Sequence, residues 1–169
     1  MKSYIFFLLI LNTLLFAQQA QKPCSMPEAE QFDFWLGDWS CEWTDQAGNV
    51  QTGTNKVEKI LGSCVIKENF DGTPAINLIG KSYSVFDARD KMWKQTWVDN
   101  SGGYLDFTGG FENGSMILSR TAKVGGKEFM QRMVWYDISA DNFMWNWERS
   151  ADNGKTWQVQ WKLHYKRKS

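Results

Sequence analysis

The chain has 169 residues, of which 15% are aromatic, and its 19 basic and 19 acidic side chains leave no net charge. A basic face for nucleic acid or for an anionic membrane is therefore not indicated. Without its first twenty residues the chain keeps about 150, enough for one domain with a sizeable core.

The N-terminus has the pattern of a secretory signal peptide. Lys2 precedes an apolar run over residues 4–16, and small residues, Ala17 and Ala20, follow it. The run is too short for a bilayer core of about 30 Å. We predict a signal peptide over 1–20, cleaved after Ala17 or Ala20, and a periplasmic or secreted location without a membrane anchor.

Residues 21–31 lead into the predicted domain at 32–167. Ser25 and Glu28 have the spacing of a helix capping box, and Pro27 suits an early helical position. A short N-terminal helix is therefore expected here.

From Trp39 onward the apolar period becomes two, which is typical of strands that bury one face. After a first strand around Trp39, Cys41 and Trp43, further strands are predicted at 50–61, 64–70, 76–87, 91–99, 103–112, 115–124, 127–138, 142–150 and 156–166. Asn113-Gly114 predicts a two-residue type I′ hairpin turn. In the last strand the following side chains are expected to face the core: Trp157, Val159, Trp161, Leu163 and Tyr165.

About ten short strands in succession predict an all-β fold, a single antiparallel meander closed into a barrel. Closure removes the exposed sheet edges that an open sheet of this size would leave. A two-sheet sandwich is the alternative, because the same pattern satisfies it.

The ten tryptophans form pairs with even spacing, so that both members of a pair share one strand face: Trp39/Trp43, Trp93/Trp97, Trp145/Trp147 and Trp157/Trp161. One interpretation is an aromatic lumen that binds a flat or apolar ligand. The other is a wide barrel filled by large side chains.

Polar side chains are expected on the same inward faces: Glu68, Gln95, Asp99, Arg132 and Arg149. Arg132 is taken to be in phase with Met130 and Val134. Converging polar groups in an apolar cavity suit a small-molecule site. Alternatively, the oxygen atoms accept hydrogen bonds from buried indole N–H groups, and Arg132 neutralises a carboxylate.

The predicted site therefore binds a small apolar or aromatic molecule in the lumen through Glu68, Trp93, Gln95, Trp97, Asp99, Arg132 and Trp147. Two alternatives stay open. One is an enzyme that uses Glu68 or Asp99 as acid or base, and the other is a module whose surface tryptophans stack on sugars or on a protein. The pattern does not define an oligomeric state.

Catalytic and metal-binding motifs are scarce. The single histidine, His164, is expected on the outward face of the last strand, which argues against a Ser-His-Asp or Cys-His arrangement in the lumen. No catalytic residue, metal or cofactor is predicted. Residues 150–157 match the Asp-box pattern S-x-D-x-G-x-T-W once, which favours a hairpin turn and not a propeller.

The three cysteines, Cys24, Cys41 and Cys64, allow one disulfide in an oxidising compartment, and the pairing is left open. Gln21, Lys22 and Pro23 fit a lipidation signal before Cys24 poorly.

Four segments occur in a characteristic order: F-D-F-W-L-G-D-W at 32–39, K-I-L-G-S-C-V-I at 59–66, W-K-Q-T-W-V-D-N at 93–100 and the Asp box at 150–157. Together they resemble a family of small exported bacterial proteins of unknown function. The resemblance spans about residues 32–167 and implies a lipocalin-like or calycin-like barrel. It implies no activity and no site residues.

Overall fold

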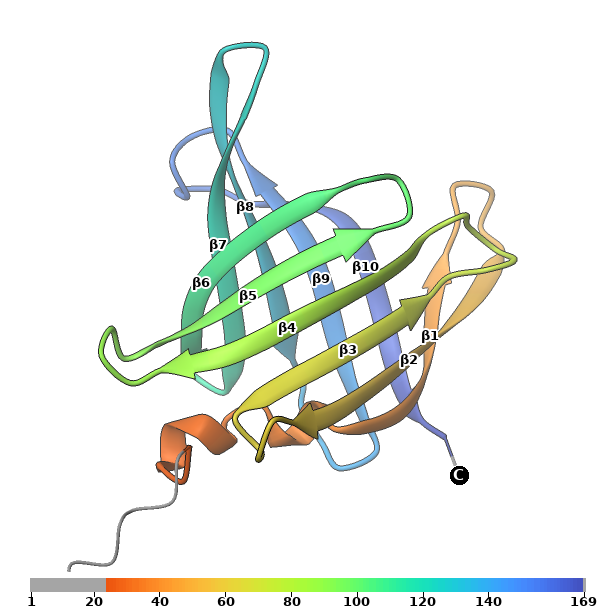
Figure 1. Cartoon of the computed structure of the whole chain (residues 1–169). Helices are drawn as coiled ribbons and strands as arrows, with labels where there is room; N and C mark the ends of the chain where they lie inside the picture. Colours follow the sequence, from red (N-terminus) through yellow and green to blue (C-terminus); the bar gives the residue numbers. More distant parts are fainter. Residues whose placement is uncertain (1–23, 169) are drawn as a thin grey trace, which may run out of the picture.

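The computed structural model describes residues 24–168 and confirms an all-β fold. The strands are β1 (Gly37–Thr44), β2 (Val50–Ile60), β3 (Val65–Asp71), β4 (Ile79–Asp87), β5 (Met92–Asp99), β6 (Tyr104–Glu112), β7 (Ser115–Val124), β8 (Lys127–Tyr136), β9 (Asn142–Ser150) and β10 (Gln158–Arg167). Each pairs antiparallel with its sequence neighbours, and β1 also pairs with β10. The predicted meander therefore closes into a ten-stranded barrel and not a sandwich (Figure 1).

The register of β1 shows how closure sets the two faces. Cys41 lies opposite Gly53 on β2 and opposite Tyr165 on β10, and both Cys41 and Tyr165 are buried. Alternate residues point to opposite faces of a strand. The inward set of β1 is thus Trp39, Cys41 and Trp43, as the alternation predicts.

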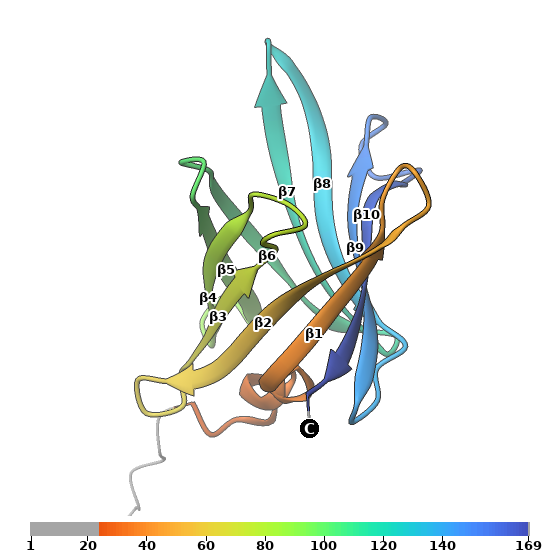
Figure 2. The ribbon, with the colours of Figure 1, turned by 90° about the vertical axis from the view of Figure 1, so that its right-hand side faces the viewer.

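Two short 3₁₀ helices, Pro27–Glu30 and Asp33–Trp35, lie across the lower end of the barrel (Figures 1 and 2). Phe32, between them, contacts the rings of Trp93 and Trp135 edge-on, at centroid distances of 4.9 and 5.2 Å. An aromatic floor therefore closes this end.

The first helix begins one residue later than the capping-box spacing predicts. Its N-cap is Met26 and makes no side-chain cap hydrogen bond, while Pro27 takes the early helical position as expected. The predicted signal peptide at 1–20 lies outside the described residues. Within residues 24–168, no helix is long and apolar enough to cross a membrane.

A disulfide joins Cys24 to Cys64, with a Cα–Cα distance of 5.2 Å. It ties the segment before the floor to the turn between β2 and β3. Cys41 is a buried free thiol, and burial raises its pKa well above the usual range. The sequence left three pairings open. The structure contains the Cys24–Cys64 pair, which leaves Cys41 in the barrel interior as a free thiol.

Two turns confirm the predicted turn chemistry. Asn113 and Gly114 both have positive φ, 49° and 79°, as a type I′ turn requires. In the Asp-box turn, the Ser150 hydroxyl donates to Asp152 Oδ1 (2.7 Å) and accepts from the Gly154 amide (2.8 Å). The indole of Trp157 donates to the Gly154 carbonyl oxygen at 3.1 Å.

The prediction for the last strand is wrong at Trp157, whose ring packs against Arg132 on the outer face, and at Val159. The side chain of Val159 is 52% exposed, because the register between β9 and β10 shifts between Val159 and Trp161. A β-bulge of this kind interrupts the strict alternation. Beyond it, Leu163 and Tyr165 are buried as expected.

Candidate functional site

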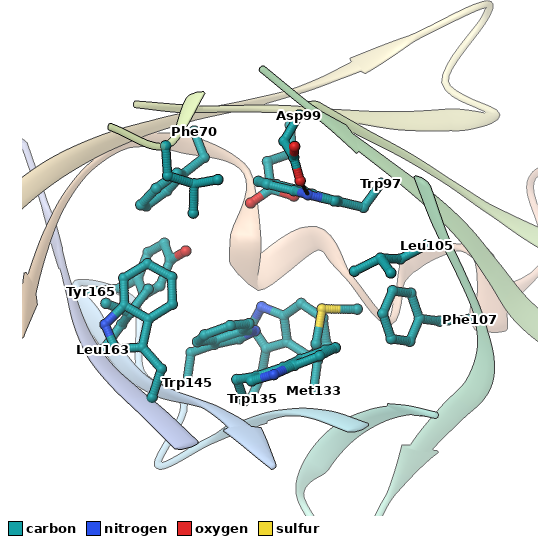
Figure 3. A pocket seen from close by; sticks show the side chains of 14 residues that line it. Phe70, Trp97, Asp99, Leu105, Phe107, Met133, Trp135, Trp145, Leu163 and Tyr165 are labelled. Carbon is teal, nitrogen blue, oxygen red and sulfur yellow. Dashed lines mark hydrogen bonds between the residues drawn. The ribbon is translucent and has the colours of Figure 1, made fainter. Parts of the chain in front are cut away.

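The barrel encloses a cavity of about 260 Å³ toward the end opposite the helical floor. Its lining is mainly aromatic and aliphatic: Glu68, Phe70, Leu78, Trp97, Asp99, Leu105, Phe107, Met133, Trp135, Trp145, Trp147, Trp161, Leu163 and Tyr165. The side chains surround an open centre, and Trp97 and Asp99 lie across it from Met133 and Trp135 (Figure 3). The barrel is thus hollow at this level and filled at its floor.

Glu68, on β3, is the buried acid of this cavity. Its two carboxylate oxygens accept hydrogen bonds from the Asn55 amide and the Ser82 hydroxyl, each at 2.6 Å. The Asn55 amide also donates to the Tyr165 hydroxyl at 3.1 Å. Burial raises the pKa of Glu68 to about 7, although the bonds from Ser82 and Asn55 oppose this.

Asp99, at the end of β5, behaves in the opposite way. Its carboxylate accepts from the Ser101 hydroxyl, the Trp97 indole (3.0 Å) and the Gly103 amide (3.0 Å). These bonds, led by the one from Ser101, lower the pKa of Asp99 to about 2. The carboxylate is therefore charged across the neutral range.

Trp93 and Gln95 are buried, but they lie outside the cavity lining. The Trp93 indole packs on the floor and donates to Gln31 Oε1 at 3.1 Å. The Gln95 amide donates to the Ser84 hydroxyl at 2.8 Å. Four of the seven predicted site residues line the cavity: Glu68, Trp97, Asp99 and Trp147.

The predicted inward orientation of Arg132 is wrong. The inward positions of β8 are those of Met133 and Trp135, which line the cavity, so Arg132 points outward. Its Nε donates to Glu148 Oε2 at 2.6 Å, and its guanidinium lies 4.0 Å from the Trp157 ring centroid. Arg132 neutralises a carboxylate, as the alternative interpretation proposed, but on the outer face.

The indole N–H groups find partners that only partly match the expected ones. Trp97 uses Asp99, as that interpretation predicts, whereas Trp39 donates to the Trp35 carbonyl oxygen at 2.8 Å. Trp35 and Trp135 have buried indole nitrogens without a hydrogen-bond partner among residues 24–168. In the described part of the chain the donors to Glu68 are Asn55 and Ser82 and not an indole, so indole satisfaction does not account for its place in the cavity.

His164 lies between the inward residues Leu163 and Tyr165 and therefore points outward, where it lines an outer groove with Glu42 and Lys162. In the described part of the chain, no group of three His, Cys, Asp or Glu side chains could hold a metal ion.

Sequence reasoning missed several lining residues, among them Leu105, Phe107, Trp135 and Tyr165, and also Asn55, which holds Glu68. The phase of Phe107 with Leu105 on β6 is a signal that could have identified both. No comparable signal marks Asn55, a single polar residue in a strand rich in polar residues.

The fold and this cavity define the class of protein: a closed ten-stranded antiparallel barrel with an aromatic lumen, consistent with a calycin-like fold. No family model matches the sequence, and no significant match occurs among curated proteins.

Proposed function

We propose that this chain is an exported binding protein that holds a small apolar or aromatic molecule in its lumen. The observation that carries the proposal is the cavity of about 260 Å³ with aromatic walls and few polar groups. A cavity of about 150 Å³ in another protein holds benzene, so this one suits about one or two fused rings. Apolar pockets with a few placed polar groups are typical ligand sites.

Export is part of the same proposal. The signal-peptide pattern at 1–20 supports it, and so does the Cys24–Cys64 disulfide, since disulfides persist in oxidising compartments. Membership of the small exported bacterial family that the four segments resemble belongs to this proposal too. The calycin-like barrel is the fold that this resemblance implies.

Filling the cavity tests the binding site. Leu105 lines the cavity, whereas its neighbour Tyr104 is 64% exposed on the opposite face of β6. Isothermal titration calorimetry with 2-naphthalenemethanol should show binding to the wild type and to Tyr104→Trp, and loss of binding in Leu105→Trp. Unchanged binding to a folded Leu105→Trp variant would place the ligand elsewhere.

An acid–base reaction in the same lumen is the second candidate, favoured by the Glu68 pKa of about 7. A group with a pKa near the working pH suits proton transfer. The charged Asp99 is less suited as an acid, because its pKa is about 2. Glu68→Gln separates the candidates: turnover of a substrate would be lost, whereas binding of an apolar ligand would persist.

The surface-tryptophan alternative has no such support. All ten tryptophans lie within residues 24–168, and every one is buried or half-buried.

A further inference from the structure

The inner face of the barrel carries two arginines one layer above the cavity, near its open end. Arg120 on β7 is in phase with the buried Met116 and Leu118, and Arg149 on β9 is in phase with Trp145 and Trp147, which line the cavity. Alternation along each strand therefore directs both arginines inward.

The sheet register places these arginines in one row. Arg120 lies opposite Gln131 on β8, and Gln131 lies opposite Arg149. The layer below is Leu118, Met133 and Trp147, in the same register. Since neighbouring strands are about 5 Å apart, the two arginine backbones are about 10 Å apart with an amide side chain between them.

The charge of this row is uncompensated within the described residues. Neither arginine has a carboxylate within 4.0 Å among the ion pairs of residues 24–168. The Arg120 guanidinium makes one long hydrogen bond, to Gln131 Oε1 at 3.4 Å, and its Nε is buried without a partner. Arg149 is exposed, whereas Arg120 is half-buried, and a half-buried cation without a counter-charge costs free energy that a bound anion would offset.

The row is also continuous with the cavity. The Arg120 guanidinium lies 5.8 Å from the ring centroid of Phe107, which lines the cavity. The Arg149 guanidinium lies 4.1 Å from the ring centroid of Phe129, which shares the inward phase of β8 with the lining residue Met133. Asp99 lies across the cavity from Met133, which belongs to the layer below the arginine row, and its carboxylate accepts hydrogen bonds from Trp97, Ser101 and Gly103 (Figure 3). An anion at the opening therefore meets the arginines on one side only.

We infer that Arg120, Gln131 and Arg149 form a head-group subsite at the open end of the lumen, and that the ligand is an aromatic or apolar molecule that ends in a carboxylate. The ring would occupy the cavity, and the carboxylate would accept hydrogen bonds from the guanidinium groups and the amide. Arginine recognises carboxylates through paired, charge-assisted hydrogen bonds. This inference rests on the proposed lumen site.

Calorimetric titration with 2-naphthoate and 2-naphthalenemethanol tests it, because the two probes share the ring and differ in charge. Hydrogen bonds to charged groups predict that 2-naphthoate binds on the order of tenfold to a hundredfold more tightly. Arg120→Gln combined with Arg149→Gln should remove this preference and leave the affinity for the alcohol unchanged. Arg89→Gln, in the exposed turn after β4, should retain the preference.

The outcomes separate the two proposals. Binding of the alcohol without a preference for the carboxylate, or a preference that survives the double substitution, overturns the subsite and leaves the lumen site standing. Failure of both probes to bind the folded wild type overturns the lumen site and the subsite with it. If the double variant unfolds, Arg120→Lys with Arg149→Lys keeps the charge without the planar fork and should weaken 2-naphthoate selectively.

Discussion

Glu68 shows at the level of one residue how the lumen combines an apolar wall with a polar centre. Asn55 and Ser82 each donate one hydrogen bond to its carboxylate, so the acid is not left unsatisfied. Removal from water nevertheless disfavours the charged form. The pKa of about 7 is the net result, and it makes Glu68 the titrating group of the cavity in the neutral range.

This pKa predicts a pH-dependent stability. The ordinary value of 4.5 applies to the unfolded chain, so between pH 4.5 and about 7 the native state binds more protons than the unfolded state. The contribution of Glu68 to the free energy of unfolding should therefore be fully present below pH 4.5. It should be lost as the pH rises through about 7, and the total loss should be about 3 kcal/mol. Urea unfolding of the wild type at pH 4.5 and pH 8 measures it.

Glu68→Gln provides the control, since the amide keeps the shape of the side chain and does not titrate. The difference in unfolding free energy between wild type and variant should shift by about 3 kcal/mol between pH 4.5 and pH 8. A constant difference would show that the native carboxyl titrates as it does in the unfolded chain.

At the scale of elements, the turn between β9 and β10 organises both faces of the neighbouring strands. Ser150 is 1% exposed, and its hydroxyl links Asp152 to the Gly154 amide. The turn places Trp157 against Arg132 on the outside of β8. This contact explains why an arginine can occupy a half-buried outer position.

Ser150→Ala should lower the free energy of unfolding by about 1 to 2 kcal/mol, because the variant loses the three hydrogen bonds of a buried hydroxyl, one to Asp152 Oδ1 and two from the Asp152 and Gly154 amides. The Gly154 amide should also exchange its proton faster, since its acceptor is gone. Chemical denaturation and amide hydrogen exchange measure the two effects. Wild-type stability together with wild-type protection of Gly154 would contradict this role of the hydroxyl.

At the scale of the whole molecule, the floor and the opening are stabilised differently. The floor consists of aromatic contacts around Phe32 and is tied down by the Cys24–Cys64 disulfide. The opening has the cavity and the arginine row, while the β7–β8 hairpin rises beyond the rim (Figures 1 and 2). Packing is concentrated at one end, and space for a ligand at the other.

Replacing both Cys24 and Cys64 by serine should lower the unfolding free energy by about 4 kcal/mol on the chain-entropy account of a closed loop. The two cysteines are 40 positions apart, so the unfolded chain without the disulfide has considerably more conformational entropy. Thermal melts with and without a reductant test this. The reductant should lower the melting temperature of the wild type and leave that of the double variant unchanged.

The sequence by itself determined the ten strands and the main turns and favoured a barrel, while the β1–β10 pairing in the structure excluded the sandwich. Strand alternation and turn chemistry are local, so Asn113-Gly114 and the Asp-box segment can be interpreted without knowing what packs against them. The aromatic lumen also follows, because even spacing places Trp145 and Trp147 on one face in any register.

Only the tertiary structure decided the orientation of Arg132, the exposure of Val159 and the cysteine pairing. On β8, apolar residues occupy both phases, since Met133 and Trp135 face the lumen while Met130 and Val134 share the outward phase of Arg132. A pattern that is apolar in both phases cannot identify the inward face. The arginine row was also decided only by the tertiary structure. Its residues come from three different strands, and the register of these strands brings together Arg120, Gln131 and Arg149.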